Sequence, residues 1–329
     1  MGLNPARTIT LIASLTTCTL ALTGCSILGE SPEPVHPDVE FVTIAAGGTS
    51  GPYYQIGAGL SQILKENLGS ISTVQATGAS VENIQLITTG RAEIAFAMGD
   101  ATRQAIEGNG PFEGRNDLND LKAITALYPN YVQIVSTKDA EVSSVDDLRG
   151  KRVGVGDINS GVELNAQMIL ESYGMSYDDI DEDFLSYGDA IDQMKNGQID
   201  AAFVTSGIPN SSVMDLATSA EVVIVPIEGE GLNKLRKEYP FFEEATIPGG
   251  TYDQTEDVTT TSITNQLLVP NDLSEDAAYL ITKTIFENLD ELYASHNAAK
   301  KITLDSVKNG LATELHPGAL KYYKEQGVL

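Results

Sequence analysis

The sequence predicts an α/β protein of two similar lobes, each built on a parallel-rich sheet, joined by two strands that form a hinge. The first observation behind this is a repeated motif, Thr49-Ser50-Gly51 and later Asn159-Ser160-Gly161. An apolar stretch opened by glycine follows each motif, at 90–97 and 197–204, which is 39 and 36 residues after its last glycine. The second observation is that strands alternate with helices within each repeat. The third is a chain too long for one core.

About 290 residues remain beyond the predicted N-terminal signal and tether, which suits two lobes of roughly 140 each. We expect lobe 1 to comprise residues 40–131 plus 266–329, and lobe 2 residues 132–265. Short apolar strands at 132–135 and 266–269 are the predicted crossings between them. Two crossings make a hinge of the kind found in proteins that close around a ligand.

The N-terminus reads as a signal peptide over residues 1–24, because Arg7 precedes a run of apolar or small residues from 9 to 22. The run is too short and too rich in threonine for a transmembrane helix. Leu22-Thr23-Gly24-Cys25 resembles the lipobox of bacterial lipoproteins, in which the cysteine is acylated. Cys25 is therefore the predicted lipidation site, followed by a Pro-rich tether over 25–39. The alternative is a plain secretory signal that is cut elsewhere.

Composition excludes several classes of protein. A formal charge of −26 argues against nucleic acid and against direct adhesion to anionic lipid. Cys25 is the only cysteine left after signal removal, because Cys18 lies inside the signal, so no disulfide is expected. His36, His296 and His316 lack the spacing of metal ligands. We therefore predict no metal site and no cofactor.

The first repeat places a candidate ligand site at the end of its first strand. Gly48 lets the backbone approach a ligand, Thr49 and Ser50 add hydroxyls, and Tyr53 can form a wall. A helix predicted over 52–68 points its amino end into this turn. Free amides and the helix dipole at that end favour an anion by about 0.3–1 kcal/mol.

The second repeat has the same arrangement. Asn159, Ser160 and Gly161 open a helix predicted to run to 173, so two helix amino ends face one cleft. Thr205 and Ser206 follow an apolar strand at its carboxyl end, where ligands bind in such sheets. A carboxylate is the predicted ligand.

Five further residues are candidate ligand contacts, and for several of them a structural role is the alternative. Thr77, Ser80 and Asn83 lie between a strand and a helix, where Ser80 can instead cap the helix by bonding the Asn83 amide. Asp100 follows the buried strand 94–98 and can receive a ligand ammonium or cap the next helix. Tyr128 precedes the first crossing and is placed over the cleft, with packing near the hinge as the alternative.

Four motifs carry a family resemblance: Gly47-Gly48-Thr49-Ser50-Gly51-Pro52-Tyr53-Tyr54, Thr77-Gly78-Ala79-Ser80-Val81-Glu82-Asn83, Asn159-Ser160-Gly161-Val162-Glu163, and Asp200-Ala201-Ala202-Phe203 with Gly207-Ile208-Pro209. Together they resemble the TAXI family, the extracytoplasmic solute receptors of tripartite ATP-independent periplasmic (TRAP) transporters. The resemblance covers about residues 40 to 325. It implies a two-lobed periplasmic-binding-protein fold (type II-like) that captures a small carboxylate or an amino acid such as glutamate. The solute then passes to an ion-gradient-driven membrane permease.

By motif position, the resemblance implies these ligand contacts: Thr49, Ser50, Tyr53, Thr77, Ser80, Asn83, Asn159, Ser160 and Gly161. Two features depart from related receptors. No segment matches the ligand-clamping arginine of the sugar-acid receptors of TRAP systems, so sugar acids are not assigned. Many family members are free in the periplasm, whereas this chain carries a lipobox. The lipobox predicts an extracytoplasmic protein that is held at the bacterial cell membrane by a lipid alone.

We expect a binding protein rather than an enzyme. A serine nucleophile at Ser50 or Ser160 lacks the Gly-x-Ser-x-Gly motif, and no Lys-Ser/Thr follows the glycines as phosphate transfer would require. The alternative to a transport receptor is a surface lipoprotein with a sensory or adhesive role, because it needs the same cleft.

Overall fold

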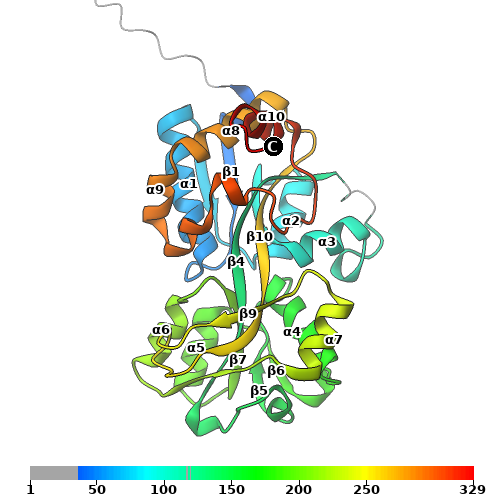
Figure 1. Cartoon of the computed structure of the whole chain (residues 1–329), viewed down its shortest axis with the longest axis vertical. Helices are drawn as coiled ribbons and strands as arrows, with labels where there is room; N and C mark the ends of the chain where they lie inside the picture. The colour runs from blue at the N-terminus through cyan, green and yellow to red at the C-terminus, as the bar shows by residue number, and fades with distance from the viewer. Residues whose placement is uncertain (1–35, 116–117, 119) are drawn as a thin grey trace, which may run out of the picture. The chain divides into compact units, whose positions relative to one another are not determined.

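The computed structural model describes residues 36–115, 118 and 120–329 (Figure 1). The predicted signal peptide, Cys25 and the tether up to residue 35 lie outside the described residues. Residues Pro37–Val39 form a short 3-10 helix, and Val39 packs into the apolar core. Within the described residues no helix has the length and apolar character needed to cross a membrane.

Strands and helices alternate along most of the described chain, as the sequence predicts. The strands are β1 (Phe41–Ala45), β2 (Ile71–Gln75), β3 (Ile94–Met98), β4 (Leu121–Thr137), β5 (Arg152–Gly154), β6 (Asp181–Asp183), β7 (Ala201–Ser206), β8 (Val222–Val225), β9 (Glu243–Ile247) and β10 (Val258–Pro270). The α-helices are α1 (Pro52–Leu68), α2 (Ser80–Thr88), α3 (Gly99–Glu107), α4 (Gly161–Ser172), α5 (Tyr187–Lys195), α6 (Ser211–Ala217), α7 (Gly229–Glu238), α8 (Glu275–Glu287), α9 (Leu289–Ser295) and α10 (Pro317–Glu325).

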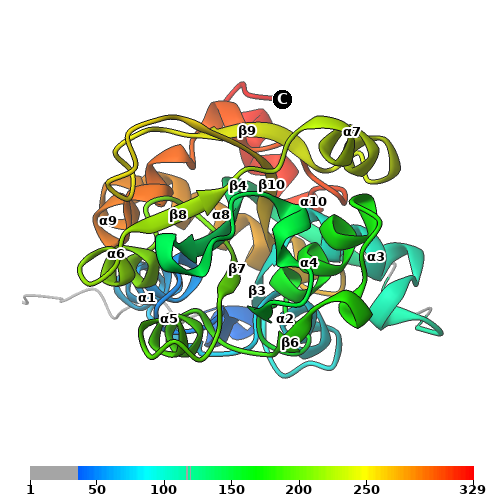
Figure 2. The same cartoon turned by 90° about the horizontal axis from the view of Figure 1, so that it is seen from below.

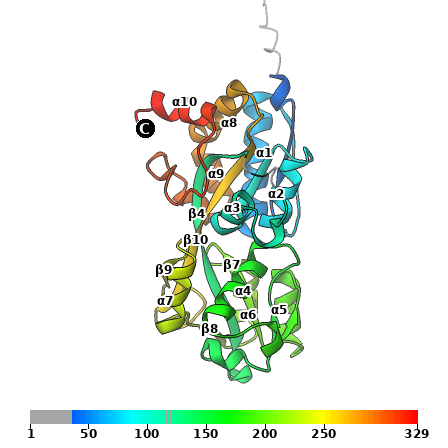
Figure 3. The same cartoon turned by 90° about the vertical axis from the view of Figure 1, so that its right-hand side faces the viewer.

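Two lobes share one hydrogen-bonded sheet. Its strand order is β2-β1-β3-β10-β4-β7-β5-β6, with β8 also on β4 and β9 also on β10. Lobe 1 contains β1–β3, α1–α3 and α8–α10, and lobe 2 contains β5–β9 and α4–α7. The long strands β4 and β10 run through both lobes, so the two predicted sheets are continuous (Figure 3). In lobe 2, α5 and α6 cover one face of β7 and α4 the other (Figure 2).

Helix α1 shows why the local sequence signals are reliable in the lobes. Pro52 starts it, because proline has no amide hydrogen to leave unpaired in the first turn. Gly69 ends it at φ 69°, a left-handed conformation that glycine adopts without strain, and its amide bonds the Lys65 carbonyl. Ile56 and Leu60 lie on its buried face, one turn apart.

The crossing strands are much longer than the short apolar runs that the sequence predicts. Pro129 lies inside β4, although proline cannot donate to a ladder. It is tolerated because the β4–β10 register shifts here: Pro129 pairs with Thr264 but Ala126 with Gln266, which leaves one extra residue on β4. The bulge lies beside Tyr128, at the point where the strand passes the cleft.

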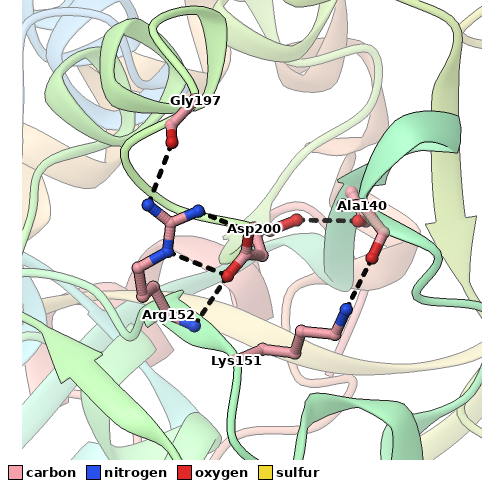
Figure 4. Close-up of polar contacts among 6 residues, drawn as sticks. Ala140, Lys151, Arg152, Gly197 and Asp200 are labelled. Carbon is pink, nitrogen blue, oxygen red and sulfur yellow. Dashed lines mark hydrogen bonds and ion pairs between the residues drawn. The ribbon is translucent and has the colours of Figure 1, made fainter.

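Each of the repeated stretches at 90–97 and 197–204 contains an acidic residue, just before its strand, that anchors a neighbouring strand. The carboxylate of Glu93, just before β3, accepts a hydrogen bond from the Thr43 amide in β1 (2.6 Å). The carboxylate of Asp200, just before β7, accepts one from the Arg152 amide in β5 (2.9 Å). Asp200 also binds the guanidinium of Arg152 through Nε (3.0 Å) and Nη2 (2.6 Å) (Figure 4). This part of the repeat is therefore structural.

We expect Asp200→Ala to lower the free energy of unfolding by about 2 kcal/mol, because charge-assisted hydrogen bonds contribute about 1.5–3 kcal/mol and Arg152 is half exposed. The hydrogen bonds from Arg152 hold the pKa of Asp200 below its ordinary value. The stabilisation is therefore present at neutral pH and lost as the pH falls through that lowered pKa. Urea unfolding at pH 7 and pH 3 measures this, with the exposed Asp192→Ala as control. Equal stability of both variants at pH 7 contradicts it.

Candidate functional site

A cavity of about 50 Å³ lies between the lobes. Four helices of eight or more residues begin at its wall: α1 after Gly51, α2 after Ala79, α4 after Ser160 and α5 after Ser186. Gly51 and Ala79 provide no side-chain cap to α1 and α2. Pro52 has no amide hydrogen, and the Glu82 amide donates to the Asn159 carbonyl. The uncapped first-turn amides therefore include those of Tyr53 in α1 and of Ser80 and Val81 in α2. The cavity therefore favours an anion on geometric grounds.

The charges at the cavity wall fit this arrangement only in part. No lysine, arginine or histidine of the described residues lines it, so the positive ends of the helices stand in for a cation. Among the residues that the structure describes, Asp157 is the one carboxylate in the wall. Burial, together with nearby Asp189 and Glu82, raises the pKa of Asp157. A cationic group on the ligand would relieve that repulsion.

Three buried polar atoms of the wall lack a hydrogen-bond partner among the described residues. They are the hydroxyls of Tyr128 and Thr205 and the Oδ1 atom of Asn130. An unpaired buried polar atom costs about 1–3 kcal/mol, and such atoms persist where a ligand or water satisfies them. Tyr128 and Asn130 belong to β4 at the hinge, and Thr205 belongs to β7 of lobe 2. A ligand in the cavity would therefore contact both the hinge and lobe 2.

Tyr53 contributes its ring rather than its hydroxyl. Its hydroxyl donates to Oδ1 of Asn265, and the Nδ2 atom of Asn265 donates to the Tyr128 carbonyl (2.7 Å). The Tyr53 and Tyr128 rings meet edge to face, with centroids 6.4 Å apart. Asn265 in β10 thus holds both residues in place, through the hydroxyl of Tyr53 and the backbone carbonyl of Tyr128.

Most of the sequence-predicted residues come together here. Nine line the cavity: Gly48, Ser50, Tyr53, Ser80, Tyr128, Ser160, Gly161, Thr205 and Ser206. Ser160 also caps α4, because its hydroxyl accepts from the Glu163 amide (3.0 Å). Ser80 does not cap α2: Ala79 holds the cap position, and the Ser80 hydroxyl accepts from the Met98 amide (3.1 Å).

Five predicted residues lie outside the cavity wall, and two of these act as scaffold. The side-chain amide of Asn83 donates to the Ala46 and Phe96 carbonyls, and its Oδ1 accepts from the Thr77 hydroxyl (2.6 Å). Asn83 is fully buried with its hydrogen bonds taken. Asn83 and Thr77 therefore shape the loops behind the cavity and do not face a ligand in this structure.

The other three lie at the lobe boundary or on the surface. Thr49 and Asn159 are exposed. Asn159 adopts φ 62°, and its carbonyl accepts from the Glu82 amide of lobe 1 (3.3 Å). Asp100 is buried against Asn165 of lobe 2 and neither caps α3 with its side chain nor reaches the cavity.

Sequence reasoning missed part of the wall. Met98, Asn130, Asp157, Ser186 and Tyr187 also line it. One of them had a readable signal: Ser186 and Asp189 have the Ser-x-x-Asp spacing of a helix start, and Ser186 caps α5. The others depend on which residues meet when the lobes close.

The lobes are closed onto each other. The Ser211 hydroxyl of lobe 2 donates to the Ser50 carbonyl of lobe 1 (2.9 Å). Gly161 lies so close to lobe 1 that a Cβ on it would be 3.1 Å from the Cβ of Ser80. The cavity is therefore formed by both lobes together.

Solved structures with a similar fold have low sequence identity to this chain. A protein from Bordetella bronchiseptica RB50 superposes with a TM-score of 0.53 at 16% identity, over 88% of this chain and 82% of that one. PhnD1 from Prochlorococcus marinus (MIT 9301), in complex with methylphosphonate, gives 0.53 at 12%, over 88% and 99%. A structure described as a periplasmic transporter gives 0.52 at 12%, over 87% and 92%.

These similarities confirm the predicted fold class, a two-lobed periplasmic-binding-protein fold. The sequence was also compared with models of protein families. Residues 44–327, nearly all of the described chain, match the model of the NMT1-like family, so this chain belongs to that family.

Proposed function

We propose that this protein is the extracytoplasmic solute receptor of a TRAP transporter, of the TAXI type, and that it captures a small carboxylate or amino acid between its lobes. The cavity carries the proposal: four helix amino ends surround it, and the unpaired Tyr128 and Thr205 hydroxyls lie in its wall. No catalytic group is needed for this role. The TAXI assignment rests on the four sequence motifs.

Ligand binding stabilises closure because the contacts come from both lobes. A solute shifts the open–closed equilibrium only by its difference in affinity for the two states. Contacts to α1 and α2 from lobe 1 and to α4, α5 and Thr205 from lobe 2 supply that difference. A micromolar receptor needs about −8 kcal/mol in total, which several hydrogen bonds in a desolvated cavity can provide.

The remaining parts of the proposal concern the membrane. A lipid on Cys25 would hold the receptor at the cell membrane, where a TRAP permease is its partner. We place the lobe boundaries at 131/132 and 265/266, inside β4 and β10. A sensory or adhesive lipoprotein is the second candidate. An uptake assay with vesicles that contain the permease distinguishes the two. A transport receptor is supported if the vesicles take up solute only after this protein is added.

The test uses the two unpaired hydroxyls. Tyr128→Phe and Thr205→Val are each expected to weaken solute binding about tenfold without changing the melting temperature of the free protein, because neither hydroxyl has an internal partner to lose. A thermal-shift screen of amino acids and small carboxylates identifies the solute, and calorimetry measures the affinity. Ser160→Ala is less informative, because it also removes a helix cap.

Tyr279→Phe and Thr218→Val are matched controls, since both hydroxyls bond surface groups far from the cavity wall. Their affinity should equal that of the wild type. Unchanged affinity in both cavity variants contradicts the proposed site. Turnover of the solute by the purified protein contradicts the receptor role.

A further inference from the structure

A buried carboxyl group lies between the lobes, outside the cavity wall. Asp100, in the first turn of α3, is 0% exposed and accepts a hydrogen bond through Oδ2 from the Nδ2 amide of Asn165 in α4. Asn165 is also 0% exposed. Because α3 belongs to lobe 1 and α4 to lobe 2, this contact requires closed lobes.

Two oxygens of this pair lack a donor. Within the described part of the chain, neither Asp100 Oδ1 nor Asn165 Oδ1 has a hydrogen-bond partner. Both are acceptors if the carboxyl group is ionised, so they cannot satisfy each other. A proton on Asp100 corrects both defects, because a carboxylic acid donates through its O–H while the amide oxygen accepts. Acid and amide can then form a pair with two hydrogen bonds.

The charged groups on the packed elements are engaged elsewhere. Arg103 and Glu107 on α3 pair with each other (3.6 Å), Glu82 on α2 accepts from the Gly78 amide, and Glu163 on α4 accepts from the Asn159 amide. Glu171, in the last turn of α4, is exposed and accepts from the Tyr239 hydroxyl (3.4 Å). β3, β10 and the 3-10 helix Gly110–Phe112 carry no acid or base. Tyr53 is a neutral neighbour. Burial outweighs the nearby amides of Ala101, Asn165 and Asp100 itself, and raises the pKa of Asp100 to about 6.

We propose that closure of the lobes takes up one proton at Asp100, which then joins the lobes by pairing with Asn165. The proposal rests on the proposed function only in that a solute drives closure. On this proposal, opening the lobes withdraws Asn165 and admits water to Asp100, which brings its pKa toward the ordinary value of about 3.9. Since the closed state has the higher pKa, it holds the proton more tightly, and closure becomes more favourable as the pH falls from 8 toward 5.

The first test needs no solute. A Cβ on Gly78 lies 3.8 Å from the Cβ of Asp157, a spacing suited to a disulfide. Gly78→Cys with Asp157→Cys, in a chain with Cys18→Ser and Cys25→Ser, locks the lobes shut and removes the half-buried Asp157 carboxylate from the cavity wall. Carboxyl carbon-13 shifts of the aspartates are then followed against pH by NMR.

We expect one aspartate of the locked protein to titrate near pH 6, and its signal to be missing after Asp100→Asn. Glu107→Gln, an exposed carboxylate on the same helix, should leave the titration unchanged. The proposal is overturned if every aspartate titrates below pH 5, or if the signal near pH 6 persists in Asp100→Asn.

The second test uses L-glutamate as the probe. Its Kd for the unlocked receptor should be about tenfold lower at pH 5 than at pH 8, given a closed-state pKa of about 6. Asp100→Asn should abolish that difference. Equal affinities at the two pH values in the wild type overturn the proposal. If glutamate does not bind while Asp100 titrates near pH 6 in the locked protein, the proton site stands and the solute assignment fails.

Discussion

Gly161→Leu is expected to weaken solute binding at least 100-fold, or about 2.7 kcal/mol, while both lobes stay folded. Gly161 is the first residue of α4 and faces lobe 1. A Cβ there would overlap Cε of Met98 and lie 2.8 Å from Oγ of Ser80. The Met98 tip can move, but Ser80 is buried and bonded to the Met98 amide. The lobes must therefore separate to admit any side chain.

Calorimetric titration with the solute found by thermal shift measures this effect. Gly188→Leu is the matched control, because Gly188 lies near the start of α5 and a Cβ on it meets only the Ser186 hydroxyl, at 4.0 Å. Small-angle scattering should show the Gly161 variant remaining open in the presence of solute. Wild-type affinity in that variant would show that closure of this face is unnecessary for binding.

Asn83→Leu is expected to lower the free energy of unfolding by about 3 kcal/mol or more. Leucine matches the size of asparagine but offers no hydrogen bond. The substitution removes the buried hydrogen bonds from Asn83 to the Ala46 and Phe96 carbonyls. The partly buried Thr77 hydroxyl loses its acceptor on Asn83 but still accepts from the Ala79 amide (3.0 Å). Each buried carbonyl that loses its partner costs about 1–3 kcal/mol. Because Ala46 and Thr77 lead into the two lobe 1 loops at the cavity, solute affinity should fall as well.

Urea denaturation measures the stability, and Asn233→Leu on the exposed face of α7 is the control, with an expected change within about 0.5 kcal/mol. A direct ligand contact would behave differently. Asn83→Leu would then lose affinity while keeping the melting temperature of the free protein. That result would show that Asn83 contacts the ligand directly and would contradict its structural role.

Local sequence signals were sufficient to predict much of the fold. Pro52 and Gly69 bracket α1 because each fixes the backbone through its own covalent structure. The apolar run Ile94–Met98 is the buried strand it was predicted to be. The crossing strands were predicted too short, because Pro129 and the polar residues 262–265 read as loop. Pairing between β4 and β10, with a bulge beside the proline, overrides that local preference.

The candidate site was predictable where a residue's position in the chain fixes its position in the sheet. Ser50 and Ser160 follow strands and Thr205 lies at the carboxyl end of β7, and the carboxyl ends of parallel strands meet at one edge. Asn130 and Tyr187 gave no such signal. Asn83 resembles a ligand contact by motif, yet its side chain turns inward to two backbone carbonyls.

The sequence by itself determined the repeat, the helices that start after Gly51 and Ser160, and the alternation of strands and helices along the chain. These features depend on residues close together in the chain, whose backbone preferences act before any packing. Only the tertiary structure decided which side chains share the cavity and which meet between the lobes, as Asp100 and Asn165 do across 65 residues of sequence. Such contacts depend on how two folded bodies close on each other, and no short stretch of sequence encodes that geometry.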